Sequence, residues 1–240
     1  MAAVAYRLLA VAPLPTLSDD YFRFLWDGQL LIHGQNPFSQ LPSEINEESY
    51  KELGLSETLY NGLNSKDYFT IYPPVNQAIF STAASSGGEN IYRGVITLKL
   101  AILLAEFINL FLLYKLLALL KKPSWWIGFY ALNPLVIIEL VGNIHFEAWM
   151  ICGILGCIYF LLREKWIGAS LMLGLGIASK LLPIMLIPLV LNTLGFWRTA
   201  TFGAIAVLTG LAGFLLIPDP GAVLNIIESV RLYFENFEFN

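Results

Sequence analysis

The feature that most constrains the fold is a succession of long apolar segments that begins near residue 95. A helix needs about 20 mostly apolar residues to cross a hydrocarbon core roughly 30 Å thick. The segments are close to this length or longer, and they cover residues 95–120, 123–141, 146–162, 166–197 and 199–217. The pattern predicts an integral membrane protein of the all-α class, a polytopic transmembrane helix bundle.

Composition supports this class. Charged residues make up 13% of the 240 residues and hydrophobic residues 57%, whereas soluble domains carry roughly 25% and about 45–50%. This balance excludes a disordered chain, a nucleic-acid binder with a basic surface and a disulfide-stapled secreted domain. Cys152 and Cys157 lie in one apolar segment at a spacing that points them to different helix faces. We therefore expect neither a disulfide nor a metal pair.

Polar and apolar stretches divide the chain into four parts. Residues 1–15 are apolar and end in Pro-Leu-Pro, and we interpret them as the end of a truncated first transmembrane helix. Residues 16–92 are a predicted external loop with ten acidic and three basic residues. Residues 93–217 are the predicted transmembrane bundle, and residues 218–240 are the predicted start of a later external segment.

The basic residues of the short connections predict the orientation. Cytoplasmic loops carry the excess of Lys and Arg. The pairs at 121–122 and 163–165 are separated by two predicted spans and therefore lie on one side, which we assign to the cytoplasm. The turn at 142–147 then lies outside, together with the acidic loop.

The segment 166–197 is too long for one span. Its 32 residues would make a helix of about 48 Å, with Lys180 near the middle, where a charge costs several kcal/mol unless it faces protein or water. A break at 178–183 gives two short helices and brings Lys180 to the external surface. For the same reason we expect Glu106 and Asn109 to face the bundle interior and to pair across helices.

A pair of aspartates follows the first apolar segment. Asp19 or Asp20 can serve as a general base if a substrate hydroxyl lies within hydrogen-bond reach. Arg23, one helical turn later, could hold a phosphate or orient the carboxylate. The alternative is that Ser18 or Asp19 simply caps a helix that starts here.

Other residues near this pair have two interpretations. Trp26 could contact substrate or anchor the chain at the membrane interface. Tyr72 could stack on a sugar or belong only to the proline turn at 70–77. Gly28 and Gly34 are predicted as turn residues.

A second polar group lies at 139–147. His145 and Glu147 could bind phosphate, relay a proton, or join Asp19 and Asp20 around a divalent cation, although compact ligand spacing is missing. His145 could also be a plain boundary residue. Lys180 would find a partner in an anionic lipid head group.

These segments together resemble the GT-C superfamily of membrane glycosyltransferases. The similarity is greatest to bacterial mannosyltransferase-like enzymes that use polyprenyl-phosphate sugars, and more distant to the catalytic subunits of GPI mannosyltransferases. It covers almost the whole chain and rests on ordered motifs: Ser18-Asp-Asp-Tyr-Phe-Arg-Phe-Leu-Trp-Asp-Gly28, Gly34-x-Asn-Pro-Phe38, Ile71-Tyr-Pro-Pro74, Gly142-Asn-x-His-x-Glu147 and Lys180-x-x-Pro183.

The resemblance implies a seven-helix module, with its first helix truncated here, in a multi-pass protein of the bacterial inner membrane. It implies inverting transfer of a sugar, mannose by resemblance, from a polyprenyl-phosphate donor to a glycan or lipid acceptor at the external face. No cofactor is implied, and a divalent cation stays open. Asp20 or Asp19 would be the catalytic base. The substrate-binding set would be Arg23, Trp26, Asp27, Tyr72, His145, Glu147 and Lys180.

Two departures and two alternatives accompany the resemblance. The aspartate pair leaves the base ambiguous, and Glu147 stands where Asp is more usual. Relatives continue past 240 residues, so we expect a fragment.

A transporter or lipid flippase would use Lys180, Glu106 and His145 to line a pathway, although polar residues gathered at one surface argue against it. A non-catalytic membrane subunit needs no charged cluster.

Overall fold

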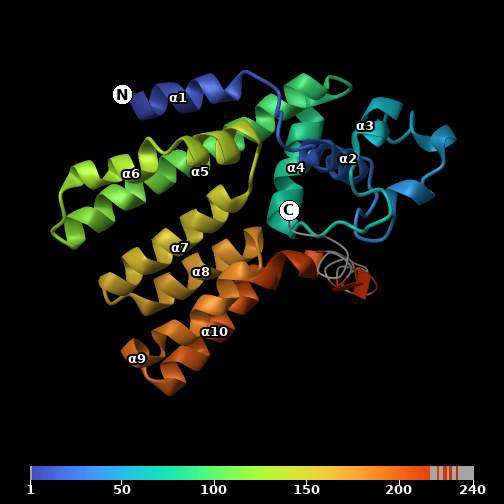
Figure 1. The fold of residues 1–240 in the computed structure, drawn as a ribbon. Coiled ribbons are helices and arrows are strands. Elements are labelled where there is room, and N and C mark those ends of the chain that lie inside the picture. The colour runs from blue at the N-terminus through green and yellow to red at the C-terminus, as the bar shows by residue number, and fades with distance from the viewer. Residues whose placement is uncertain (1, 217–220, 222–223, 226, 229–230, 232–240) are drawn as a thin grey trace. The chain divides into compact units, whose positions relative to one another are not determined.

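The computed structural model describes residues 2–216 together with 221, 224–225, 227–228 and 231 (Figure 1). Helices account for about 74% of the described residues, which contain no strand. The predicted all-α class is confirmed. The predicted external segment 218–240 lies largely outside the described residues.

The chain forms two compact units. Unit 1 comprises residues 1–14, 74–76 and 99–214, and unit 2 comprises residues 15–73, 77–98 and 215–240. Helix α5 (Ile91–Leu119) contributes its first residues to unit 2 and the rest to unit 1.

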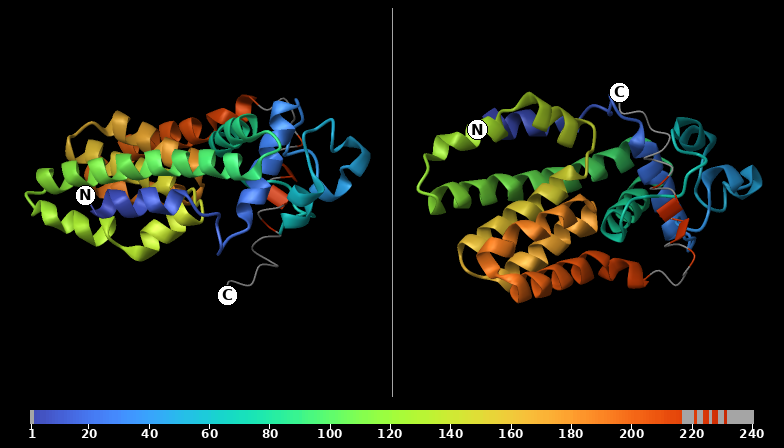
Figure 2. Two further views of the ribbon diagram at one scale, coloured as in Figure 1. Left: turned by 90° about the horizontal axis from the view of Figure 1, so that it is seen from above. Right: turned by 60° about the horizontal axis from the view of Figure 1, so that its bottom comes forward.

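Unit 1 is built from consecutive helices connected by short turns. After α1 (Ala2–Val11) and α5 come η3 (Ser124–Ile127), α6 (Gly128–Ala131), η4 (Val136–Gly142), α7 (Glu147–Leu162), α8 (Trp166–Ser179), η5 (Leu182–Val190), α9 (Leu191–Leu194), α10 (Phe196–Leu211) and η6 (Ala212–Leu216). Helix α8 packs between α7 and α10 (Figure 2).

The helix ends in unit 1 follow sequence signals. Helix α1 ends at Val11, just before the predicted proline stop. Helix α8 ends at Ser179, and Lys180 has extended backbone angles of φ −154° and ψ 136°. The predicted break at 178–183 is therefore confirmed. The segment 123–141, in contrast, is not one straight span, because the helical pieces on either side of Asn133-Pro134 are bent by 61°.

By length and composition, one described helix suffices to cross a membrane, namely α5. The bent pair Ser124–Ala131 and Val136–Gly142 adds a second if it counts as one span. Helices α7 and α8 are apolar but shorter, with 16 and 14 residues.

Unit 2 packs around α2 (Asp20–Ile32) and is built with η1 (Pro42–Glu44), η2 (Glu47–Ser49), α3 (Glu57–Gly62) and most of α4 (Pro74–Gly87). Trp26 has no exposed surface and contacts the rings of Tyr50 and Tyr60. Gly28 lies inside α2, so its prediction as a turn residue is wrong. A Cβ atom there would lie 2.3 Å from the Phe80 carbonyl oxygen, which means that only glycine lets α4 approach α2 this closely.

Candidate active site

Asp20 begins α2 and is held by two donors from a later part of unit 2. The Asn64 amide donates a hydrogen bond to Asp20 Oδ1 at 3.0 Å, and the Tyr72 hydroxyl donates to Oδ2 at 3.4 Å. The Asp20 side chain is half-buried. Two fixed donors orient a carboxylate, so this side chain is positioned rather than free to rotate.

Asp19 occupies the cap position of α2 but does not cap the helix with its side chain. It is exposed, and the Ser18 hydroxyl instead accepts a hydrogen bond from the Asp20 backbone N–H at 3.3 Å. Burial, followed by the negative charge of Asp19, raises the pKa of the neighbouring Tyr21 phenol. Asp20 is therefore half-buried and hydrogen-bonded, whereas Asp19 is exposed.

Arg23 and Asp27 form a buried ion pair one turn apart on α2, with Nε and Oδ1 at 2.7 Å. Arg23 Nη1 also donates to the backbone carbonyl groups of Ser65 and Tyr68, both at 2.9 Å. The other Asp27 oxygen accepts from Gln77 at 3.0 Å. In this structure the pair fixes the loop that carries the two donors to Asp20.

A second cluster lies in unit 1 and unites His145, Glu147 and Lys180. Lys180 Nζ donates to Glu147 Oε1. His145 lies 3.9 Å from Glu147 and 3.7 Å from Glu139, measured between ring nitrogen and carboxylate oxygen. Lys180 is 50% exposed and His145 35%. His145 and Glu147 are neighbours in the sequence, whereas Lys180 comes from a later segment, and the structure brings the three side chains together.

The backbone beneath this cluster is fixed by buried hydrogen bonds. The Ser179 hydroxyl donates to the Phe146 carbonyl at 3.1 Å, and the Asn76 amide donates to the Ser179 carbonyl at 2.9 Å. Ile144 adopts a φ of 62°, a strained value for a β-branched residue. Strain of this kind persists where the surrounding structure imposes it, often at functional sites.

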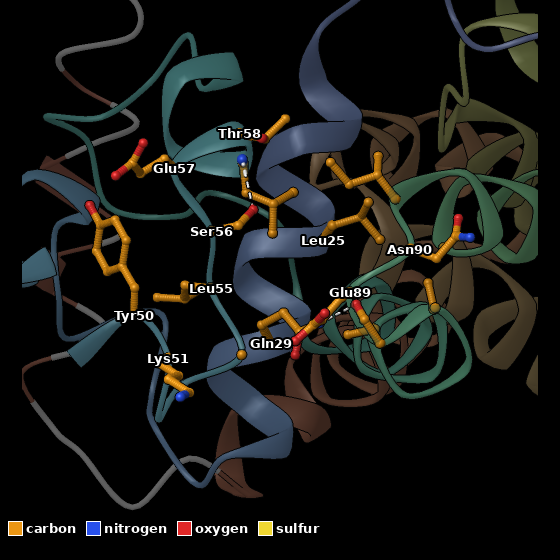
Figure 3. A pocket seen from close by; sticks show the side chains of 18 of the residues that line it. Leu25, Gln29, Tyr50, Lys51, Leu55, Ser56, Glu57, Thr58, Glu89 and Asn90 are labelled. Atoms are coloured by element: carbon orange, nitrogen blue, oxygen red, sulfur yellow. Dashed lines mark hydrogen bonds between the residues drawn. The ribbon is translucent and has the colours of Figure 1, made fainter. Parts of the chain in front are cut away.

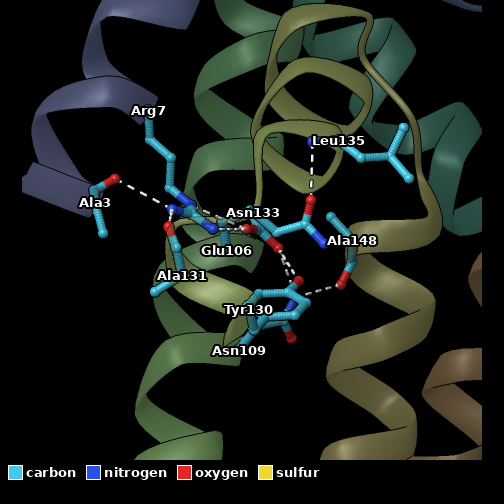
Figure 4. A network of polar contacts seen from close by, with 9 residues as sticks. All are labelled: Ala3, Arg7, Glu106, Asn109, Tyr130, Ala131, Asn133, Leu135 and Ala148. Atoms are coloured by element: carbon cyan, nitrogen blue, oxygen red, sulfur yellow. Dashed lines mark hydrogen bonds and ion pairs between the residues drawn. The ribbon is translucent and has the colours of Figure 1, made fainter. Parts of the chain in front are cut away.

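Glu106 and Asn109 lie at the centre of a buried network in unit 1, which also contains two residues that the sequence did not single out, Arg7 and Tyr130 (Figure 4). Glu106 accepts from Arg7 at 2.8 Å, from the Tyr130 hydroxyl at 2.5 Å and from Asn109 at 3.0 Å. Asn109 also donates to the Ala148 carbonyl at 2.9 Å. Glu106 and Asn109 were expected to pair with other helices, and this is confirmed. The partner that was not expected is Arg7. A charged residue inside an apolar helix is energetically costly, and this could have pointed to Arg7 from the sequence.

Within the described part of the chain, no group of three or more His, Cys, Asp or Glu side chains is arranged to hold a metal ion. Cys152 and Cys157 are both free and buried.

Residues 3–195 match a protein family described as alpha-(1->6)-mannopyranosyltransferase, N-terminal domain. This range includes Asp20 with its two donors, and also the cluster of His145, Glu147 and Lys180. The chain belongs to this family. The predicted relationship to mannosyltransferases is confirmed, and membership in this mannosyltransferase family supports a glycosyltransferase with a sugar donor and an acceptor. Comparisons with curated proteins and with solved structures found no match.

Proposed function

We propose that the protein transfers mannose from a polyprenyl-phosphate donor to a hydroxyl group of a glycan or lipid acceptor, with inversion at the anomeric carbon. The family match supports mannosyl transfer. A lipid-borne donor suits a chain with apolar helices, because the donor reaches the site through the bilayer. The sugar arrives activated as a phosphoester, so the proposal includes no cofactor.

Asp20 is the proposed general base. Positive charge develops at the anomeric carbon as the sugar leaves phosphate, and the acceptor oxygen must lose its proton as it attacks. The observation that carries this assignment is the pair of hydrogen bonds from Asn64 and Tyr72 to Asp20. They leave a half-buried carboxylate in a fixed orientation, whereas Asp19 points into solvent.

Lys180 and His145 are the proposed contacts of the leaving phosphate. A lysine ammonium has three N–H donors, and Lys180 is half exposed while it donates to Glu147. The remaining donors are available to an anion. Positive charge held in place before the reaction stabilises the phosphate as it leaves.

The proposed setting is a multi-pass helix bundle of the GT-C type in the bacterial inner membrane, with the reaction at its external face. Helix α5 supports a spanning segment. The shorter helices α7 and α8 are about 24 Å and 21 Å long at 1.5 Å per residue, which matches the bilayer core only with local thinning or with flanking residues at the interface.

The test replaces each aspartate by asparagine in the purified protein and supplies polyprenyl-phosphate mannose with a mannoside acceptor. We expect Asp20→Asn to lower kcat by roughly 100-fold or more, the typical contribution of a general base. Asp19→Asn is the matched control and retains most activity. Equal activity of Asp20→Asn and wild type would remove Asp20 as the base, and wild type without any mannosyl transfer would refute the proposed reaction.

A further inference from the structure

Unit 2 contains a pocket that is separate from the Asp20 carboxylate (Figure 3). Its volume is about 530 Å³, and its walls come from α2, from the segment 47–59 and from the turn between α4 and α5. Small-molecule sites typically enclose about 300–1,000 Å³. The pocket is therefore large enough for a ligand, and none of the residues assigned above to the reaction line it.

One polar side chain in the wall is buried and incompletely hydrogen-bonded. Gln29 is 3% exposed and lines the pocket, and its amide nitrogen donates to the Gly88 carbonyl at 3.0 Å. Among the described residues no donor bonds its Oε1 atom, and this atom is not fully enclosed by protein. Gly54 leaves room for this oxygen, because a Cβ atom there would lie 2.7 Å from it. A ligand hydroxyl would satisfy Oε1.

The charges around the pocket are mainly negative. Glu47, Glu57 and Glu89 line it, with Lys51 as the single basic residue. Burial raises the pKa of the Tyr50 phenol, and the nearby charges of Tyr60, Glu47 and Glu57 raise it further. A phosphate would be repelled here, which argues against the lipid-phosphate donor. Carboxylates accept hydrogen bonds and therefore suit a neutral ligand rich in hydroxyl groups.

The apolar part of the wall fits the same ligand class. Leu25, Leu55 and Ala84 line the pocket beside the polar groups. Ser56 and Asn90 stabilise the backbone turns that line the pocket, because each side chain accepts a hydrogen bond from the backbone N–H three residues later. A pyranose presents hydroxyl groups at its edge and C–H groups on its faces, so it can use both kinds of wall.

We propose that this pocket binds the glycan acceptor, holding mannose units that precede the unit whose hydroxyl is glycosylated. The proposal rests on the mannosyl transfer proposed above and adds a subsite for the acceptor chain. It follows that the enzyme prefers a longer acceptor, and that this preference depends on residues lining the pocket.

The test compares two acceptors that share one alkyl aglycone, an α-mannoside and its α-(1→6)-linked tetrasaccharide. In wild type we expect a lower KM for the tetrasaccharide. Two pocket variants are compared with wild type. The double variant Glu57→Gln with Glu89→Gln removes two charged hydrogen-bond acceptors from the wall, and Thr58→Trp places a large side chain in the pocket from an exposed position. We expect the tetrasaccharide KM to rise roughly tenfold, the effect of losing one hydrogen bond to a charged group. The monosaccharide KM, the donor KM and kcat stay unchanged.

Glu48→Gln is the matched control, since Glu48 is exposed but does not line the pocket. A second measurement, tetrasaccharide binding to the detergent-solubilised protein without donor, separates the two proposals. Binding that the pocket variants weaken supports the subsite even if no mannose is transferred. Normal mannosyl transfer, with the same length preference in wild type and pocket variants, overturns the subsite and leaves the reaction intact.

Discussion

Arg7 and Glu106 form an ion pair in which neither side chain has any exposed surface. Arg7 also donates to the Ala3 and Ala131 carbonyl groups, at 3.1 Å and 2.6 Å. One guanidinium thus ties α1 to α5 and to the end of α6 (Figure 4). A charge in such a place is stable only while its partner is present, because a buried unpaired ion loses its hydration without compensation.

Arg7→Met should therefore destabilise the protein by about 3–5 kcal/mol, the typical cost of removing one partner from a buried pair. The free energy of unfolding by SDS in mixed micelles measures this. The double variant Arg7→Met with Glu106→Gln should recover part of the loss, since no unpaired charge remains. Arg163→Met is the control, because the Arg163 side chain is exposed and donates to the Tyr159 hydroxyl in its own helix end. If Arg7→Met unfolded no more easily than this control, the pair would contribute nothing.

Among the elements, α7 and α8 approach each other so closely that Gly153 on α7 has no room for a side chain. A Cβ atom on Gly153 would lie 2.4 Å from the Gly176 nitrogen and 2.5 Å from its Cα. Small residues at helix contacts allow close backbone packing, the main attraction between helices in a lipid environment. This packing matters for the site, because α7 begins with Glu147 and α8 ends just before Lys180.

Gly153→Ala should force these helices apart and cost about 1–3 kcal/mol, as overpacking does. A lower midpoint of thermal unfolding in detergent would show it. Gly128→Ala makes the same change where nothing lies within 4 Å of the added Cβ and where φ is −58°, so we expect its midpoint to stay at or above that of wild type. Equal midpoints for both variants would contradict the close contact.

The sequence predicts an element correctly when the residues that determine it are neighbours along the chain. Proline and a lone lysine mark helix ends by themselves, so the end of α1 and the break at Lys180 were predictable. The interior glycine Gly28 was not, because its role depends on the carbonyl of Phe80 in another helix. The donors to Asp20 are 44 and 52 residues away along the chain, and the partner of Arg7 is 99 residues away. No local pattern encodes such pairs.

The whole molecule consists of two units, and each carries one of the clusters proposed to act in mannosyl transfer. Unit 2 holds Asp20 and the proposed acceptor pocket, and unit 1 holds Glu147 and Lys180. Under the proposed reaction, unit 2 would bind the acceptor and unit 1 the donor phosphate. The proposed multi-pass topology requires residues 16–92 to lie outside the membrane and the basic connections at 121–122 and 163–165 to lie on the cytoplasmic side.

Single cysteines test this topology, because Cys152 and Cys157 are buried and give little background. We expect Glu48→Cys to react with a membrane-impermeant maleimide in intact spheroplasts. Lys122→Cys and Lys165→Cys should react only after the membrane is permeabilised. The unsubstituted protein is the control for background labelling. Labelling of Lys122→Cys from outside would reverse or abolish the proposed orientation.

The Arg7–Glu106 pair also bears on biosynthesis. If α1 enters the bilayer as the nascent chain emerges, its guanidinium arrives long before the carboxylate that neutralises it. With 99 positions between them and translation at about 5–20 residues per second, the delay is roughly 5–20 s. During that interval the insertion machinery, a water-filled channel or the lipid head groups must shelter the arginine. Ribosome pausing before the codon for Glu106 would lengthen the interval in which Arg7 has no partner.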